Sequence, residues 1–66
     1  MNESCIAIID KLVEIRRKKG ITQTQLAASI GLPQPVIARF ESKKHAPQLD
    51  TLVKIATALE CEIKIV

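Results

Sequence analysis

The chain has 66 residues, of which 47% are apolar, 26% charged and 2% aromatic, and its formal net charge is +3. Domains of about 60 residues bury only about 60% of the surface that their unfolded chains expose. We therefore expect one small domain over residues 1–66, without the deep cleft of a metabolic enzyme. The apolar content excludes intrinsic disorder. The longest apolar run, Cys5–Ile9, is far shorter than the roughly 18 residues of a membrane-spanning helix. With no secretory signal recognisable, we expect a cytoplasmic protein with no membrane partner.

Cysteine and histidine are too scarce for a metal centre or a disulfide scaffold. The chain has two cysteines, Cys5 and Cys61, and one histidine, His45, whereas structural zinc needs four ligands. We expect both cysteines to be small buried apolar residues. A disulfide between them is the alternative, which a reducing cytoplasm disfavours. Cys5 and His45 lie on different predicted elements without a third orienting group. The sequence therefore predicts no metal, no cofactor and no enzymatic activity.

Basic residues concentrate in two short segments, Arg16–Lys19 and Arg39–Lys44. Residues 1–48 hold eight Lys and Arg against four Asp and Glu, so the positive charge lies in the first three-quarters of the chain. A basic patch of this kind suits a polyanion such as nucleic acid. The alternative for Arg16–Lys19 is a set of solvated cations that stabilise the C-terminus of a helix.

The first two predicted helices are bounded by glycine and threonine. Apolar residues at helical spacing predict a helix over residues 5–19, and Gly20 ends it because glycine adopts a left-handed conformation at little cost. Thr22 is expected to cap the next helix with its hydroxyl; that helix runs over residues 23–30 and ends at Gly31. The defining apolar residues are Cys5, Ile8, Leu12, Val13 and Ile15 in the first helix and Leu26, Ala27 and Ile30 in the second.

Two prolines restrict the start of a third helix. Proline is tolerated in a first helical turn, where its missing amide would be unpaired anyway, and is disruptive further on. Because of Pro33 and Pro35, the helix is expected to begin near Pro33 or Gln34 and to reach Glu41, before a basic loop over residues 42–47. Its apolar stripe consists of Val36, Ile37 and Phe40.

The last part of the chain predicts a fourth helix over residues 49–59 and a strand over residues 61–66. Helical spacing is kept by Leu49, Leu52, Val53, Ala56 and Leu59. Cys61, Ile63 and Ile65 then alternate with charged residues, which is the period of a half-buried strand. An isolated strand leaves backbone groups unpaired. We therefore expect it to pair with the same strand of a second copy, with those three residues in the dimer interface.

Residues 23–42 meet the requirements of a helix-turn-helix motif. Two short helices that cross closely need small side chains, and their corner needs a residue tolerant of positive φ. They also need apolar residues that hold both helices to a third. The small residues are Ala27, Ala28 and Gly31, and the apolar ones are Leu26, Ile30, Leu32, Ile37 and Phe40. In such a motif the second helix presents its first turn and one face to the DNA major groove.

A longer pattern joins the motif to a known family. It consists of Thr22-Gln23-x-x-Leu26-Ala27-x-x-Ile30-Gly31-Leu32 followed by Gln34-x-x-Ile37-x-Arg39-x-Glu41. This pattern closely resembles the phage-repressor and Cro-like helix-turn-helix family, also called the Xre family, over about residues 8–60. The resemblance implies an all-α fold, a small four-helix lambda-repressor-like domain, here followed by the short C-terminal strand. That ending resembles the one in small antitoxin-type repressors. The chain departs from the family pattern at Pro33, where a Ser or Thr cap is common, and at Glu60, where glycine is common.

The resemblance also implies roles for individual residues. The residues that would face base edges are Gln34, Pro35, Val36 and Arg39. The residues that would contact phosphates are Thr22, Gln23, Ser42, Lys43 and Lys44. Arg16 and Glu41 would form an ion pair between the first and third helices. Gln34 can pair with adenine and Arg39 with guanine, each bidentate contact contributing about 1–3 kcal/mol of discrimination. Pro35 and Val36 offer only van der Waals contact. The alternatives are a solvent-facing Arg39 and a merely solvated loop, in which His45 is exposed.

We therefore expect a transcriptional regulator that binds double-stranded DNA sequence-specifically, as a homodimeric repressor on an inverted-repeat operator. The alternative is an antitoxin that binds a toxin protein and also regulates its own operon. A protein-interaction module that has lost DNA binding is a third class. Binding of single strands by base stacking is disfavoured, because Phe40 is the only aromatic residue and its spacing places it in the core.

Overall fold

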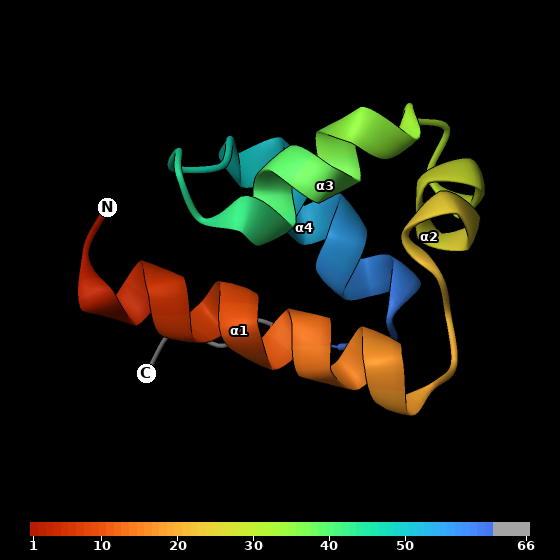
Figure 1. The fold of residues 1–66 in the computed structure, drawn as a ribbon, viewed down its shortest axis with the longest axis horizontal. Coiled ribbons are helices and arrows are strands. Elements are labelled where there is room, and N and C mark those ends of the chain that lie inside the picture. The colour runs from red at the N-terminus through yellow and green to blue at the C-terminus, as the bar shows by residue number, and fades with distance from the viewer. Residues whose placement is uncertain (62–66) are drawn as a thin grey trace.

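The structure, a computed structural model, describes residues 1–61 and contains four helices in that part of the chain (Figure 1). They are α1 (Glu3–Lys18), α2 (Gln23–Ser29), α3 (Gln34–Ser42) and α4 (Leu49–Ala58). The long α1 runs along one side of the molecule, α3 and α4 lie over it, and α2 closes one end (Figure 1). The predicted all-α class is confirmed. The predicted strand falls largely on residues 62–66, which lie outside the described residues, and Cys61 belongs to no helix.

Local signals set the ends of the first two helices. α1 begins two residues earlier than predicted, because the side chain of Asn2 caps it by accepting a hydrogen bond from the backbone amide of Cys5 at 2.8 Å. Gly20 and Gly31 end α1 and α2 with φ angles of +70° and +69°, as predicted. The predicted cap Thr22 forms a full capping box, in which its hydroxyl accepts from the Gln25 amide and the Gln25 side chain accepts from the Thr22 amide.

The third and fourth helices begin without side-chain caps. Pro33 stands at the N-cap of α3 and Pro35 in its first turn, where the lost amide costs no intrahelical hydrogen bond. The predicted start is therefore confirmed. Lys43 ends α3 with a φ of 60°, and Glu60 follows α4 in the same left-handed conformation. Both are positions at which a glycine would be less strained.

Helix packing corrects two parts of the predicted core. On α1, Ile8 is 38% exposed, whereas its neighbour Ile9 is fully buried. On α4, Leu49 and Val53 were expected to face the core, but they are 74% and 46% exposed. Ile55, which was not among the expected core residues, is buried instead. The core consists of Ile9, Leu12, Leu26, Ala27, Ile37, Phe40, Ile55, Ala56 and Leu59. The spacing of apolar residues predicts which face of a helix is buried only to within about one residue, which is a rotation of about 100° around the helix axis. Packing against the neighbouring helices sets the actual rotation.

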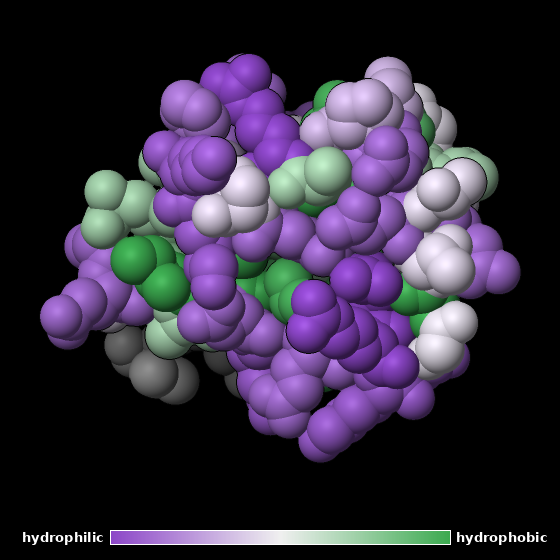
Figure 2. Space-filling model, in the orientation of Figure 1, coloured by the Kyte–Doolittle hydropathy of each residue, from purple (hydrophilic) through white to green (hydrophobic). Residues whose placement is uncertain are grey.

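Both cysteines are free thiols that are half-buried and pack against this core, as small apolar residues do. None of the helices within residues 1–61 is long and apolar enough to cross a membrane. The face seen in Figure 2 is mostly hydrophilic, and its apolar residues gather mainly between α1 and the helices above it.

Candidate nucleic-acid interface

The outward face of α3 is formed by residues that the sequence assigned to base contact and by their neighbours. Pro35 and Arg39 are exposed, Gln34 and Val36 are half-buried, and Ile37 points into the core. Gln34 and Val36 lie on opposite flanks of this face, since they are two residues apart and each helical residue turns by about 100°. α3 therefore presents a short outward face of Pro35 and Arg39, flanked by the amide of Gln34 and the apolar side chain of Val36.

Val36 and Arg39 border a hollow on the flank of α3 that faces the next loop. This pocket has a volume of about 400 Å³, and His45, Pro47 and Thr51 line it from the loop and from the first turn of α4. His45 is exposed, as expected for a loop histidine. Val36 is therefore half-buried at the edge of the outward face, against this hollow.

On the opposite flank, Gln34 is joined to α2 by a direct hydrogen bond. Its Nε2 donates to Oε1 of Gln23 at 2.8 Å, and Nε2 of Gln23 donates to Oε1 of Glu41 at 2.9 Å. The first residues of α2 and α3 are thus connected through their side chains, and both are connected to the buried end of α3. The sequence predicted contacts of these two glutamines with different DNA groups, and the hydrogen bond between them was not predicted.

The carboxylate of Glu41 is held by the guanidinium of Arg16. Nε of Arg16 donates to Oε2 at 2.6 Å and Nη2 donates to Oε1 at 3.0 Å, while Nη1 donates to the backbone carbonyl of Ile21 at 2.7 Å. Both side chains are 9% exposed. The expected pair is therefore present, with bidentate geometry that satisfies the charge on each side. It ties α3 to α1 and to the turn before α2.

The loop lysines have different environments. Nζ of Lys43 forms an ion pair with Asp10 on α1, so this lysine holds the C-terminal end of α3 against α1. Lys44 is exposed and pairs with no carboxylate of residues 1–61. Ser42 donates its hydroxyl to the carbonyl of Arg39 at 2.6 Å and accepts from the Lys44 amide at 3.4 Å. Of these three residues, Lys44 has the least constrained side chain.

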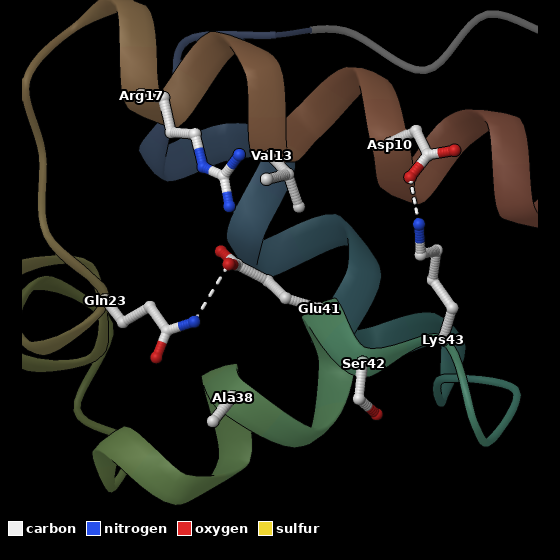
Figure 3. A pocket seen from close by; sticks show the side chains of 8 residues that line it. All are labelled: Asp10, Val13, Arg17, Gln23, Ala38, Glu41, Ser42 and Lys43. Carbon is white, nitrogen blue, oxygen red and sulfur yellow. Dashed lines mark hydrogen bonds and ion pairs between the residues drawn. The ribbon is translucent and has the colours of Figure 1, made fainter.

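A pocket of about 340 Å³ lies between α1 and α3, and Figure 3 shows the side chains around it. Arg17 points into it from α1 toward Glu41, and Gln23 points into it from α2 (Figure 3). Asp10 and Lys43 form its other end. Arg17 and Asp10 were not among the predicted site residues. The basic segment Arg16–Lys19 was a signal for Arg17, whereas nothing in the sequence marked Asp10 as a partner of Lys43.

The side chains predicted to contact phosphate already use part of their hydrogen-bonding capacity within the protein. The Thr22 hydroxyl accepts from the Gln25 amide at 3.0 Å and keeps its own proton for donation. The Gln23 amide group is engaged at both ends and retains one N–H. In the described part of the chain, no group of three or more His, Cys, Asp or Glu side chains is placed to hold a metal ion. The expected dimer contacts Ile63 and Ile65 lie outside the described residues.

Comparisons with known proteins agree with this geometry. A family described as helix-turn-helix matches residues 12–66. An uncharacterized HTH-type transcriptional regulator of Haemophilus influenzae is 41% identical over 61 residues, which are 92% of this chain and 62% of the relative. The antitoxin HigA1 of Mycobacterium tuberculosis is 30% identical over 97% of this chain and 43% of the relative.

A third relative is the cryptic phage CTXphi transcriptional repressor RstR of Vibrio cholerae, 38% identical over 85% of this chain and 50% of the relative. The chain thus spans between 43% and 62% of the length of these three relatives. No solved structure matches the chain significantly.

Proposed function

The chain belongs to the helix-turn-helix family, and from this premise we propose that it is a transcriptional regulator that binds double-stranded DNA sequence-specifically. The observation that carries the proposal is the outward face of α3, which has Gln34 at its start, Arg39 exposed further along, and the basic loop directly after its last residue. Such a helix fits the major groove, whose width admits one α-helix. Relatives named as a transcriptional regulator and as a phage repressor support the same role.

In this proposal the residues of the face divide into two kinds of contact. Gln34 and Arg39 hydrogen-bond to base edges, while Pro35 and Val36 make van der Waals contact, for example with a thymine methyl group. The phosphate contacts come from the helix starts and the loop, and consist of Thr22, Gln23, Ser42, Lys43 and Lys44. Phosphate contacts set the register of the protein on the duplex, and base contacts read its sequence.

We further propose that the protein binds as a two-fold homodimer that represses by occupying an inverted-repeat operator. Two recognition helices related by a dyad reach half-sites about 34 Å apart, one turn of the duplex. Cys61, Ile63 and Ile65 are the proposed dimer contacts. The proposed location of the protein is the cytoplasm, where the DNA lies. Sedimentation of a chain truncated after Leu59 tests the interface: the truncated chain is expected to be monomeric. A truncated chain that remains dimeric would remove this proposal.

Selection of bound sequences from a randomised duplex pool tests DNA binding, symmetry and half-site spacing together. We expect an inverted repeat, and an affinity that falls steeply with salt because phosphate contacts release counterions. The Arg39→Ala variant is the matched control for the outward face. Enrichment of no sequence by the wild-type chain, or a bound set unchanged by Arg39→Ala, would contradict the assigned role of α3.

A second candidate function is an antitoxin that binds a toxin protein and regulates its own operon. Two named relatives favour it, the antitoxin HigA1 and the antitoxin HipB of Escherichia coli, the latter 39% identical over 46 residues. Purification of the tagged chain from its native host tests this function. A second small protein recovered in stoichiometric amount, whose gene lies beside the operator, would support the antitoxin role. Recovery of the chain alone would favour the repressor.

A further inference from the structure

We infer that the pocket between α1 and α3 takes one phosphate group, with Arg17 of α1 as the charged group that binds it. The pocket has a volume of about 340 Å³ and is lined by side chains from α1, α2 and α3 (Figure 3). Two sources offer this chemistry, the backbone of duplex DNA and a free phosphate ion. For the duplex, the inference rests on the proposed function, and it adds a contact from α1 to those proposed above.

Arg17 is the one charged group at this pocket whose side chain has no partner of opposite charge within residues 1–61. Both carboxylate oxygens of Glu41 accept from Arg16, at 2.6 and 3.0 Å, and Lys43 is paired with Asp10. The guanidinium of Arg17 points into the pocket toward Glu41 (Figure 3) but forms no ion pair or hydrogen bond with these residues. Three cations and two carboxylates leave one positive charge, which a phosphodiester with its single negative charge balances.

The polar groups that the pocket keeps available beside this charge are hydrogen-bond donors. The guanidinium of Arg17 has N–H groups in a fixed fork that matches two phosphate oxygens. Gln23 points into the pocket from α2, and its amide nitrogen donates one N–H to Glu41 at 2.9 Å and retains the other. Val13 and Ala38 complete the walls with short apolar side chains. Donors around an uncompensated cation are what an anion requires.

The position of the pocket fits a phosphate of a duplex that lies against α3. Ala38 lines the pocket and follows Gln34 by four residues, so both lie on the same side of the helix. A helix in the major groove has a phosphate backbone along each flank, since the groove admits one α-helix. On the flank of Gln34, the contacts proposed above from α2 and the residue before it, Gln23 and Thr22, are uncharged. Arg17 supplies the positive charge there.

Titration of the free protein with inorganic phosphate tests the pocket without DNA. We expect the NMR signals of the Gln23 carboxamide to shift until they saturate, and sodium chloride at the same ionic strength to leave them in place. Arg17→Gln is expected to abolish the saturable shift without unfolding the chain, because Arg17 is exposed. Lys19→Gln is the matched control and is expected to retain the shift, since it removes the same charge from an exposed residue that caps the end of α1.

Replacement of single phosphates of the selected operator by neutral methylphosphonates tests the duplex as the source. One such replacement is expected to weaken binding of the wild-type chain and of Lys19→Gln, and to leave binding of Arg17→Gln unchanged, because that variant has already lost the contact. Arg17→Gln is also expected to lower the slope of log affinity against log salt concentration by at most about 0.9, the value for one phosphate contact.

The two measurements together identify the source of the phosphate. A methylphosphonate position that Arg17→Gln no longer senses would assign the pocket to the duplex backbone, whether or not inorganic phosphate binds. A saturable shift lost in Arg17→Gln, without any such position, would assign it to a free phosphate ion. If Arg17→Gln and Lys19→Gln behaved alike in both measurements, only net charge would matter and the inference would be overturned. Failure of the wild-type chain to bind any duplex would overturn the proposed function, and the phosphate titration would still decide about the pocket.

Discussion

The guanidinium of Arg16 on α1 and the carboxylate of Glu41 on α3 face each other through two hydrogen bonds, and both side chains are 9% exposed. Arg16 is the only Lys or Arg residue among residues 1–61 that is buried. Its third contact, to the carbonyl of Ile21, ties the turn before α2 to the same centre. The relative positions of α1, α2 and α3 therefore depend on one buried ionic group.

Removal of one partner of this pair is expected to be strongly destabilising. Arg16→Met or Glu41→Leu leaves a buried charge without its counter-ion, which costs about 3–5 kcal/mol. The double variant removes both charges and is expected to recover much of that loss. Urea denaturation of the three variants checks the coupling. If the double variant were destabilised by the sum of the two single effects, the pair would contribute no coupling.

Release of Lys43 from Asp10 is expected to strengthen binding to any duplex. Asp10 competes with phosphate for the ammonium group, so Asp10→Asn frees a cation beside α3. Because Asp10 no longer competes for the Lys43 phosphate contact, the slope of log affinity against log salt concentration is expected to steepen by at most about 0.9, the value for one full phosphate contact.

Asp50→Asn provides the control for this change in charge, because Asp50 pairs with Lys54 at 3.1 Å on the exposed side of α4. It removes the same charge without freeing a residue of the proposed interface. Equal effects of the two variants on affinity and salt slope would mean that only net charge matters, and that Lys43 does not reach the DNA.

Arg39 and Lys44 are expected to differ in what they contribute to binding. Arg39→Ala removes a base contact, so affinity for the selected operator falls by about 1–3 kcal/mol while binding to random duplex changes little. Lys44→Ala removes a phosphate contact and weakens both about equally. Titration of each variant against operator and random duplex at the same salt concentration separates the two cases. An equal loss on both duplexes for Arg39→Ala would make Arg39 a phosphate contact.

The capping box of α2 is expected to contribute measurably to stability. Thr22→Ala removes the hydroxyl that accepts from the Gln25 amide at 3.0 Å, which typically costs about 1 kcal/mol. Thr24→Ala, two residues later on the exposed surface, is the control and should change the unfolding free energy by less than about 0.5 kcal/mol. Urea denaturation of both variants measures the difference. Equal stabilities would show that water replaces the cap without cost.

Much of the fold was readable from residues close together in the chain. Gly20 and Gly31 end their helices because a left-handed residue costs glycine little, Thr22 caps because its hydroxyl reaches a nearby amide, and Pro35 restricts α3 to one start. The pair between Arg16 and Glu41 was reached through the family resemblance, since nothing local relates residues on two different helices.

The tertiary structure alone decided how each helix is rotated and which polar groups meet. Periodicity did not distinguish Ile8 from Ile9, and the burial of Ile9 follows from the helices packed on α1. Likewise, the bonds from Gln34 to Gln23 and from Lys43 to Asp10 join residues 11 and 33 positions apart. Sequence by itself determined the elements, because capping and helix-ending energies act over a few residues. The side chains that face each other across helices depend on packing, which involves the whole chain at once.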